Sequence, residues 1–262
     1  MNIILLDPGE VIDQSVLLGG RRADHIVKIL RAQPGDIVKI GILNGKIGYG
    51  TIKELNRTPP RSVRLQLDLR HDPPGKPRID LILALPRPIM LKRIVHQLAS
   101  LGIGRLYLIN AAKVEKSFWE ASILDQDNLR QHLLAGLEQA VDTRLPEVSL
   151  HRGFRPFVEN LLPQLAARYD RMLVAHPGDA DHLRSVFHPG PGNVLLAVGP
   201  EGGWNDFEVR SLAEAGFTPV SLGARILRVE TAVIVLHAMI SLVQEAAGEP
   251  PTGCRPAESN GR

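Results

Sequence analysis

Short apolar runs alternate with helical patterns from residue 78 onward, and this alternation restricts the fold more than any other feature. The run at 79–85 is almost entirely apolar and precedes a helical pattern over 90–101. The same order recurs along the chain, with strands expected at 105–109, 147–150, 172–175, 194–198 and 219–222 and helices at 128–141, 156–168 and 206–215. Apolar strands that alternate with helices are typical of an α/β domain with a mostly parallel sheet whose faces are both covered.

The preceding residues have a different, β-rich pattern. Asn44-Gly45 separates the strand patterns 37–43 and 47–53, which predicts a β-hairpin. A proline-rich polar break follows at 71–77. We therefore predict three parts, listed in chain order: a small β-rich domain over 1–72, the α/β domain over 78–247 and a flexible tail over 248–262.

Composition excludes several classes of protein. The single cysteine, Cys254, excludes a disulfide framework and a cysteine-based metal cluster. The longest apolar segment, 232–243, is too short to span a membrane, and the first ten residues lack the basic region of a signal peptide. The formal charge of +3 is only a mild bias toward anionic partners. We expect a cytoplasmic protein without a metal or a membrane partner.

Two loops in 195–232 form the candidate site. The first, Gly199-Pro200-Glu201-Gly202-Gly203, brings three glycines directly after an apolar strand, where the backbone can approach a ligand closely. It is not GxGxxG and lacks the GK[ST] of a P-loop. The second, 222–231, interleaves charged and aliphatic residues. In a parallel sheet both loops would lie at the carboxyl ends of strands, where such folds bind ligands. A glycine-rich turn without a ligand is the alternative for the first loop.

The last helix, expected over 232–245 with Thr231 as its N-cap, is apolar almost all the way round. A helix of this kind must be covered on more than one side. We predict that it forms a dimer interface, and a central core helix is the alternative.

Four sequence segments now carry a resemblance. GPEGG at 199–203, together with LGARILRVETA at 222–232, resembles the RsmE family of ribosomal RNA methyltransferases, members of the SPOUT class with a C-terminal trefoil knot. HIVKILRAQPGD at 25–36 is similar to the PUA-like RNA-binding domain of that family, and LEQAVDTRLPEV at 137–148 is similar to its central signature. The fold implied is a small PUA-like β-barrel followed by a knotted SPOUT domain.

The resemblance implies an activity and a set of partners. They are a homodimer, S-adenosyl-L-methionine as methyl donor, and N3 of a uridine in the 16S rRNA of the small ribosomal subunit as acceptor, with S-adenosyl-L-homocysteine as product. The cofactor-binding residues expected are His176, Val198, Gly199, Pro200, Glu201, Gly202, Leu222, Gly223, Ile226, Leu227, Arg228 and Thr231.

Arg228 and Glu230 are the candidate catalytic residues. When the N3 proton of uridine leaves, negative charge develops on the two carbonyl oxygens, and Arg228 is placed to stabilise it. Glu230 would orient Arg228 or take the proton. A salt bridge between the two side chains is the alternative reading of this pair. His176 is a weak candidate for a general base, because His-Pro is also a common turn.

Basic residues suggest where RNA would bind. The candidates are Arg21, Arg22, His25, Lys28, Arg31, Arg87, Lys116 and Arg144. The first five have a plain alternative as a solvated helix face. Trp119, beside Lys116, is a candidate for stacking on an extruded base, although an aromatic that anchors a loop to the core is the more common case.

Two functions remain as alternatives. One is a SPOUT methyltransferase that acts on another RNA or on a ribose 2′-hydroxyl. The other is a non-catalytic RNA-binding assembly factor. Departures from the family pattern at 96–102 and 140–143 leave the RNA-facing details open.

Overall fold

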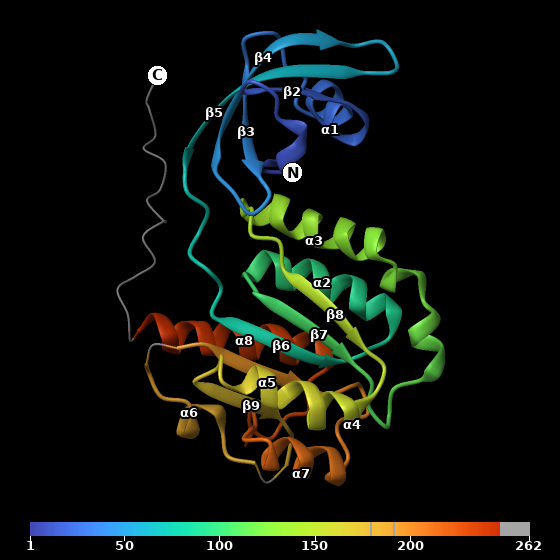
Figure 1. Ribbon diagram of the computed structural model, residues 1–262, viewed down its shortest axis with the longest axis vertical. Coiled ribbons are helices and arrows are strands. Elements are labelled where there is room, and N and C mark those ends of the chain that lie inside the picture. The colour runs from blue at the N-terminus through green and yellow to red at the C-terminus, as the bar shows by residue number, and fades with distance from the viewer. Residues whose placement is uncertain (179, 191, 247–262) are drawn as a thin grey trace. The chain divides into compact units, whose positions relative to one another are not determined.

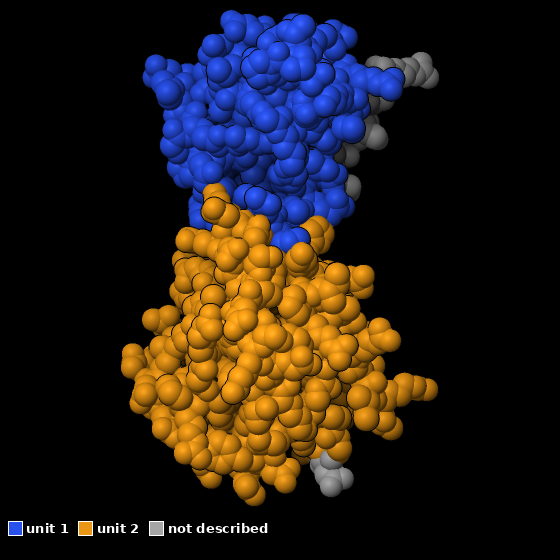
Figure 2. Space-filling model, turned by 90° about the vertical axis from the view of Figure 1, so that its right-hand side faces the viewer, with its two compact units in different colours: residues 1–74, 131–145 blue, residues 75–130, 146–262 orange. Residues whose placement is uncertain are grey.

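The computed structural model describes residues 1–178, 180–190 and 192–246. The predicted flexible tail therefore lies outside the described residues. The chain divides into two compact units, coloured separately in Figure 2. The first comprises 1–74 and 131–145, and the second comprises 75–130 and 146–262. The predicted division at 1–72 and 78–247 stays a prediction.

The first unit is built on a five-stranded sheet with the strand order β1-β3-β4-β5-β2. Its strands are β1 (Ile4–Leu6), β2 (Ser15–Leu18), β3 (Ile37–Ile42), β4 (Ile47–Asn56) and β5 (Ser62–His71). The predicted hairpin is confirmed: β3 and β4 are antiparallel, and Asn44 between them has a φ of 56°. Helix α1 (Gly20–Asp24) continues into a π-helical turn at His25–Ile29, and both cover the core with Ala23, Ile26 and Val27.

Residues 131–145 belong to the first unit although they lie in the middle of the chain. They contain most of helix α3 (Gln126–Ala140). After this helix, the Thr143 hydroxyl donates to the carbonyl of Gly45 at 2.8 Å, and the Asn44 amide donates to the carbonyl of Thr143 at 2.7 Å. The hairpin turn and the end of α3 are thus bonded to each other, which the sequence pattern did not indicate.

The second unit contains a six-stranded sheet in which every neighbouring pair is parallel, with the order β11-β9-β10-β6-β7-β8. The strands are β6 (Ile79–Ala84), β7 (Arg105–Ile109), β8 (Glu147–His151), β9 (Arg171–Ala175), β10 (Val194–Val198) and β11 (Thr218–Val220). The predicted mostly parallel α/β fold is confirmed. Every residue of β6 and β10 is buried, as expected for strands covered on both faces.

Helices cover this sheet (Figure 1). They are α2 (Pro88–Leu101), α4 (Phe154–Pro156), which leads through a π-helical turn into α5 (Leu162–Ala166), α6 (Leu183–Val186), α7 (Asp206–Glu214) and α8 (Val229–Glu245). Short 3₁₀ turns occupy Pro8–Glu10 in the first unit and Lys116–Glu120 and Ser122–Leu124 in the second. No helix in the described ranges is long and apolar enough to cross a membrane.

The start of α8 corrects one prediction. Thr231 is not its N-cap, because the helix already begins at Val229 and Arg228 is the N-cap residue. Arg228 is extended, with φ −65° and ψ 153°, so the chain turns into the helix directly after the loop. Thr231 therefore lies exposed in the first turn of α8.

Candidate functional site

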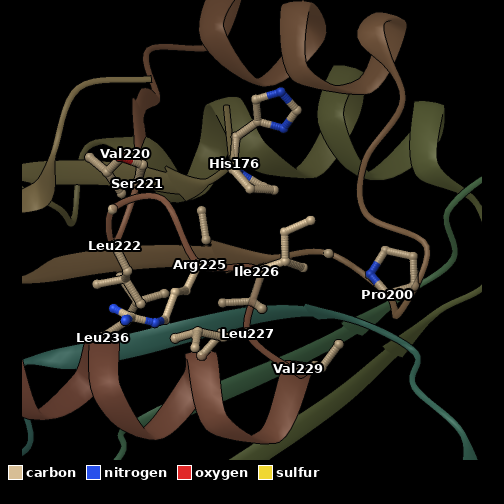
Figure 3. Close-up of a pocket in the computed structure, with 16 residues that line it drawn as sticks. His176, Pro200, Val220, Ser221, Leu222, Arg225, Ile226, Leu227, Val229 and Leu236 are labelled. Atoms are coloured by element: carbon tan, nitrogen blue, oxygen red, sulfur yellow. The ribbon is translucent and has the colours of Figure 1, made fainter. Parts of the chain in front are cut away.

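A pocket opens at the carboxyl ends of three neighbouring strands (Figure 3). β9 contributes Ala175 and the following His176-Pro177, β10 contributes Val198 and the following Gly199-Pro200, and β11 contributes Val220 and the following loop. The start of α8 closes the remaining side. The space between these walls is about 570 Å³ when the part open to solvent is counted. It fits a small organic molecule better than a single ion.

Most of the predicted cofactor-binding residues line this pocket. They are His176, Val198, Gly199, Pro200, Leu222, Gly223, Ile226 and Leu227. Glu201, Gly202, Arg228 and Thr231 do not line it. Glu201 instead accepts a hydrogen bond from the Arg87 amide at 2.9 Å, and the carbonyl of Gly202 accepts one from Lys113 Nζ at 2.7 Å. These two bonds fix the first loop to the segments that follow β6 and β7.

Eight lining residues were not predicted. They are Ala175, Pro177, Val220, Ser221, Arg225, Val229, Ala232 and Leu236. Four of them follow from element boundaries. Val220 is the last residue of β11, and Val229, Ala232 and Leu236 lie in the first part of α8, which begins at Val229. The apolar spacing of Val229, Ala232 and Leu236 matches one helix face. This spacing was visible in the sequence, but it indicated the site only once the helix start was known.

Backbone groups in the pocket walls are free to bind a ligand. Within the described residues, the N–H and C=O groups of Leu222 and Leu227 make no backbone hydrogen bond. Their side chains and those of Val198 and Val220 make the walls apolar. Ile226, on the same loop, is 86% exposed, although a large aliphatic side chain favours burial. A flat apolar ligand would cover Ile226 and use the free backbone groups.

Gly199 lets Trp204 pack directly against the backbone of the first loop. A Cβ atom at this position would lie 3.1 Å from the backbone nitrogen of Trp204 and 3.2 Å from its indole Nε1. Trp204 is buried, and its Nε1 has no hydrogen-bond partner. The Nδ1 atom of His176 is also buried without a partner. Figure 3 shows the His176 ring directed away from Ile226 and Leu227. The imidazole is therefore poorly placed to act on a substrate beside that loop.

The two candidate catalytic side chains lie at the edge of the pocket. Arg228 is exposed and its side chain does not cap α8. Glu230 is half-buried in the first turn of the helix. In the part of the chain that the structure describes, no ion pair joins Arg228 to Glu230. The Arg228 guanidinium is therefore exposed and not paired with Glu230 in this structure, and the catalytic roles of the two residues stay predictions.

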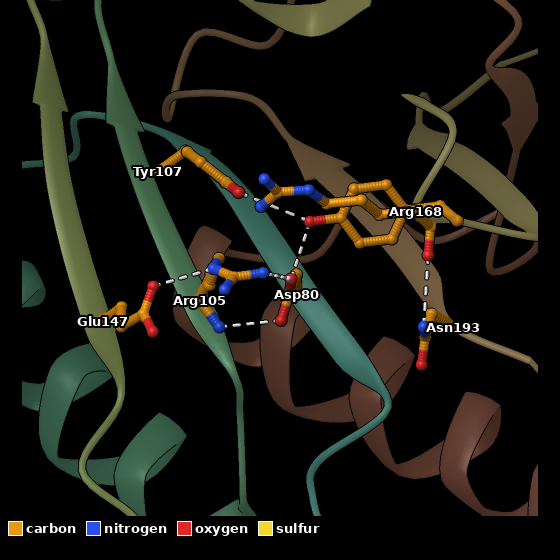
Figure 4. Close-up of polar contacts among 7 residues, drawn as sticks. Asp80, Arg105, Tyr107, Glu147, Arg168 and Asn193 are labelled. Atoms are coloured by element: carbon orange, nitrogen blue, oxygen red, sulfur yellow. Dashed lines mark hydrogen bonds and ion pairs between the residues drawn. The ribbon is translucent and has the colours of Figure 1, made fainter. Parts of the chain in front are cut away.

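A polar cluster lies toward the amino ends of the strands, away from the pocket (Figure 4). Tyr169 donates to Asp80 Oδ2 at 2.6 Å, and the Arg105 amide donates to Asp80 Oδ1 at 2.7 Å. Arg105 Nε also donates to Glu147 at 2.8 Å. Burial raises the pKa of Asp80, and burial together with the bond to Asp80 raises the pKa of Tyr169. A Cβ at Gly104 would meet Asp80 Oδ1, so this cluster packs tightly and joins β6, β7 and β8.

Three of the five basic residues predicted near the N-terminus are engaged inside the first unit. Arg21 pairs with the buried Glu138 at 2.7 Å, Arg22 donates to Glu10 at 2.8 Å, and Lys28 pairs with Asp24 at 2.9 Å. Burial lowers the pKa of His25, and its Nε2 has no partner. Arg31 is exposed and has a φ of 52°. The Arg22 side chain is thus the most enclosed of these cations, at 25% exposed, whereas Arg21, Lys28 and Arg31 stay accessible.

The other RNA-binding candidates differ in their surroundings. Arg87 and Lys116 are exposed on loops that follow β6 and β7. Arg144 Nε donates to the carbonyl of Pro74 at 2.5 Å, so its side chain is held within the first unit. Trp119 is buried and its indole donates to Asn110 at 2.9 Å. The structure therefore makes Trp119 a loop anchor and not a base-stacking surface.

The chain is similar to RNA methyltransferases. The family model described as an RNA methyltransferase domain matches residues 74–241. The chain is 30% identical over 244 residues to ribosomal RNA small subunit methyltransferase E of Treponema pallidum, covering 92% of this chain and 90% of the relative. It is 26% identical to ribosomal RNA small subunit methyltransferase E 1 of Borreliella burgdorferi, covering 89% of this chain and 94% of the relative.

Solved structures share the fold. The structure of a ribosomal RNA small subunit methyltransferase E from Neisseria gonorrhoeae, bound to S-adenosyl methionine, has a TM-score of 0.76 at 21% identity, over 93% of this chain and 98% of that one. A methyltransferase of Legionella pneumophila, also in complex with that cofactor, has a TM-score of 0.75 at 23% identity, over 94% and 98% of the two chains. In the described ranges of this chain, no group of three or more His, Cys, Asp or Glu side chains is arranged to hold a metal ion.

Proposed function

Since the chain belongs to the RNA methyltransferase family, we propose that it methylates N3 of a uridine in the 16S rRNA of the small ribosomal subunit, with S-adenosyl-L-methionine as methyl donor. The names of its curated relatives support the ribosomal substrate. The observation that carries the proposal is the pair of free backbone sites at Leu222 and Leu227 in an apolar pocket. An adenine ring needs both the apolar walls and the free backbone groups, because its faces are apolar and its edge carries hydrogen-bonding nitrogens.

The residues present fit this cofactor. The leucine backbone groups would hold the adenine edge, and Ile226 would cover one ring face. Gly199 and Pro200, which line the same pocket, would face the rest of the cofactor. Such sites typically combine apolar walls with a few fixed polar groups. When bound, S-adenosyl-L-methionine would supply an activated methyl group.

The chain's own contribution to the chemistry rests on Arg228. Uridine N3 carries a proton that must leave before its lone pair can attack, and the negative charge then spreads to two carbonyl oxygens. The exposed Arg228 guanidinium at the pocket edge would donate hydrogen bonds to one of them. Glu230, in the first turn of α8, would accept the proton or orient Arg228. Holding the nucleophile against the activated methyl group supplies the rest of the rate enhancement.

Three further features belong to this proposal. The second unit would form a trefoil knot, which is supported by β10 lying between β9 and β6 while the chain after β11 returns to the pocket. The sheet of the first unit would form a PUA-like barrel that binds RNA. The enzyme would act as a homodimer, and its ribosomal substrate implies a cytoplasmic location.

Two measurements, made one after the other, test the proposed function. Calorimetry should show one S-adenosyl-L-homocysteine bound per chain. Small subunits lacking the modification should then gain a methyl group, and nucleoside mass spectrometry should identify 3-methyluridine. A 2′-O-methyl nucleoside would show that the acceptor is wrong. If S-adenosyl-L-homocysteine did not bind at all, the catalytic assignment would fail and an assembly factor would be favoured.

A further inference from the structure

Three aromatic rings lie in contact beside the pocket. The Phe154 ring centroid is 6.2 Å from that of Trp204 and 6.3 Å from that of Phe207. Trp204 is buried behind Gly199, whereas Phe207 is 42% exposed. The row of contacts therefore begins at the pocket wall and ends in an aromatic side chain that faces solvent.

Phe207 is held in place by its helix start. Asn205 caps α7, because its side-chain oxygen accepts from the Glu208 amide at 2.8 Å. The Glu208 carboxylate accepts from the Asn205 amide at 2.9 Å and from the Ala112 amide at 2.7 Å. Glu208 is buried, so these bonds are shielded from water. The first turn of α7, which carries Phe207, is thus fixed to the loop after β7.

An arginine lies over this exposed ring. The Arg155 Cζ atom lies 4.9 Å from the centroid of Phe207. Arg155 is exposed, and within the described residues no carboxylate pairs with it. Arg152, on the same segment after β8, lies over Trp119 at 5.2 Å. The exposed carboxylates of the neighbouring first loop and helix start are Glu201, which bonds to the Arg87 amide, and Asp206.

We propose that Phe207 and Arg155 form a binding site for an unpaired nucleotide of the RNA substrate, next to the one that is methylated. This inference rests on the proposed function. The base stacks on the exposed part of the Phe207 ring, and the unpaired Arg155 guanidinium moves to the adjacent phosphate. The N3 imide of uridine takes part in base pairing, so N3 can be methylated only while the uridine is unpaired. Proteins commonly hold single-stranded RNA by stacking its bases on aromatic rings.

An RNA partner fits this surface better than a protein partner. The exposed ring is paired with an unneutralised arginine, the combination that binds a base and its phosphate. The segment that carries Arg155 follows β8, at the same end of the parallel sheet as the pocket. Because Gly199, Trp204, Phe154 and Phe207 are in contact one after another, the site accommodates a flanking nucleotide of the same strand.

The test separates stacking from charge in the full-length chain. Fluorescence anisotropy would measure binding of a labelled single-stranded RNA of mixed sequence, at several salt concentrations. Phe207→Leu should weaken binding about tenfold with an unchanged salt slope, and Phe207→Trp should restore it. Arg155→Ala should weaken binding and lower the salt slope by about one, because one phosphate contact is lost. Arg171→Ala, an exposed arginine at the amino end of β9, is the matched control.

Other outcomes overturn the proposal. If Phe207→Leu binds RNA as tightly as the wild type, no base stacks on this ring. A loss of affinity for assembled small subunits, with unchanged affinity for RNA, would assign the surface to a ribosomal protein instead. S-adenosyl-L-homocysteine binding should be unchanged in all variants. If the wild type failed to bind that product, the proposed function would fail, while RNA binding would still decide the stacking site.

Discussion

Ile226 is the residue whose environment most clearly requires a ligand. Its side chain is 86% exposed on a loop that lines the pocket, so replacing it should cost the free chain little stability. We expect Ile226→Asp to weaken S-adenosyl-L-homocysteine binding at least about tenfold, because the bound ligand would bury the carboxylate against an apolar ring. Calorimetry measures the affinity, and thermal unfolding should be unchanged.

A matched control exists in the first unit. Ile12 is 71% exposed and lies in the other compact unit, so Ile12→Asp should leave cofactor affinity unchanged. Equal affinity in the wild type and in Ile226→Asp would mean that the ligand does not contact this loop.

Arg228 has a separate role and a separate readout. Because its side chain neither lines the pocket nor caps α8, Arg228→Ala should keep both the stability and the affinity for S-adenosyl-L-homocysteine. The turnover number should fall about 100-fold, the usual effect of losing one group that stabilises a developing oxyanion. Single-turnover methyl transfer to small subunits measures this step. A wild-type rate in Arg228→Ala would remove the arginine from the mechanism.

At the scale of the element, the cluster around Asp80 predicts a pH dependence of stability. Burial raises the pKa of Asp80 above its usual value of 3.8, so the folded chain holds this proton more tightly than the unfolded chain. The contribution of Asp80 to the free energy of unfolding therefore falls as the pH rises from that usual value through the folded-state pKa. Above the folded-state pKa it remains at the lower level.

Asp80→Asn isolates this contribution. The amide keeps a hydrogen-bonding group for the Arg105 amide and for the Tyr169 hydroxyl, but it cannot ionise. We expect the free energy of unfolding of the wild type, relative to this variant, to decrease in urea titrations as the pH rises above 3.8 and through the folded-state pKa. Asp72→Asn, at an exposed position in a loop, should give a constant difference. A constant difference for Asp80→Asn as well would mean that Asp80 is not destabilised by burial.

The elements of the second unit could largely be predicted because their signals are local. Each central strand is a short apolar run buried on both faces, and its bounds agree with the pattern to within about one residue. The predicted start of α8 was wrong. Thr231 has a side chain that is typical of an N-cap, but the helix begins after Arg228, which makes no side-chain cap. Because the predicted helix start was about one turn too late, Val229 was not predicted as a pocket residue.

Contacts between distant segments had no comparable signal. The bonds of Thr143 with Gly45 and Asn44 join residues about 100 positions apart, and neither segment shows a periodicity that indicates the other. The same holds for Glu208, whose carboxylate accepts a bond from the Ala112 amide in the loop after β7. The sequence therefore indicated the loops of the site but not the bonds that fix them.

At the scale of the whole molecule, the proposed homodimer rests on α8. Its buried residues, such as Val233, Leu236 and Ile240, lie on one face. On the remaining surface Leu242 is 68% exposed, and α2, which packs against α8, exposes Ile89 to 57%. Large aliphatic side chains exposed on two packed helices indicate an interaction surface. A second copy of the chain that covers them would satisfy the apolar character of α8.

Leu242→Glu tests this assignment. A carboxylate at the exposed position should leave the chain folded but should disfavour burial against a second copy, because an unpaired charge is costly to desolvate. Sedimentation velocity should then show a dimer for the wild type and a monomer for this variant. Ile12→Glu, an exposed isoleucine of the first unit, should remain dimeric. A dimeric Leu242→Glu variant would move the interface away from α8, and a monomeric wild type would exclude the homodimer. If the monomer also binds S-adenosyl-L-homocysteine, each chain holds a complete cofactor site, as the single-chain pocket implies.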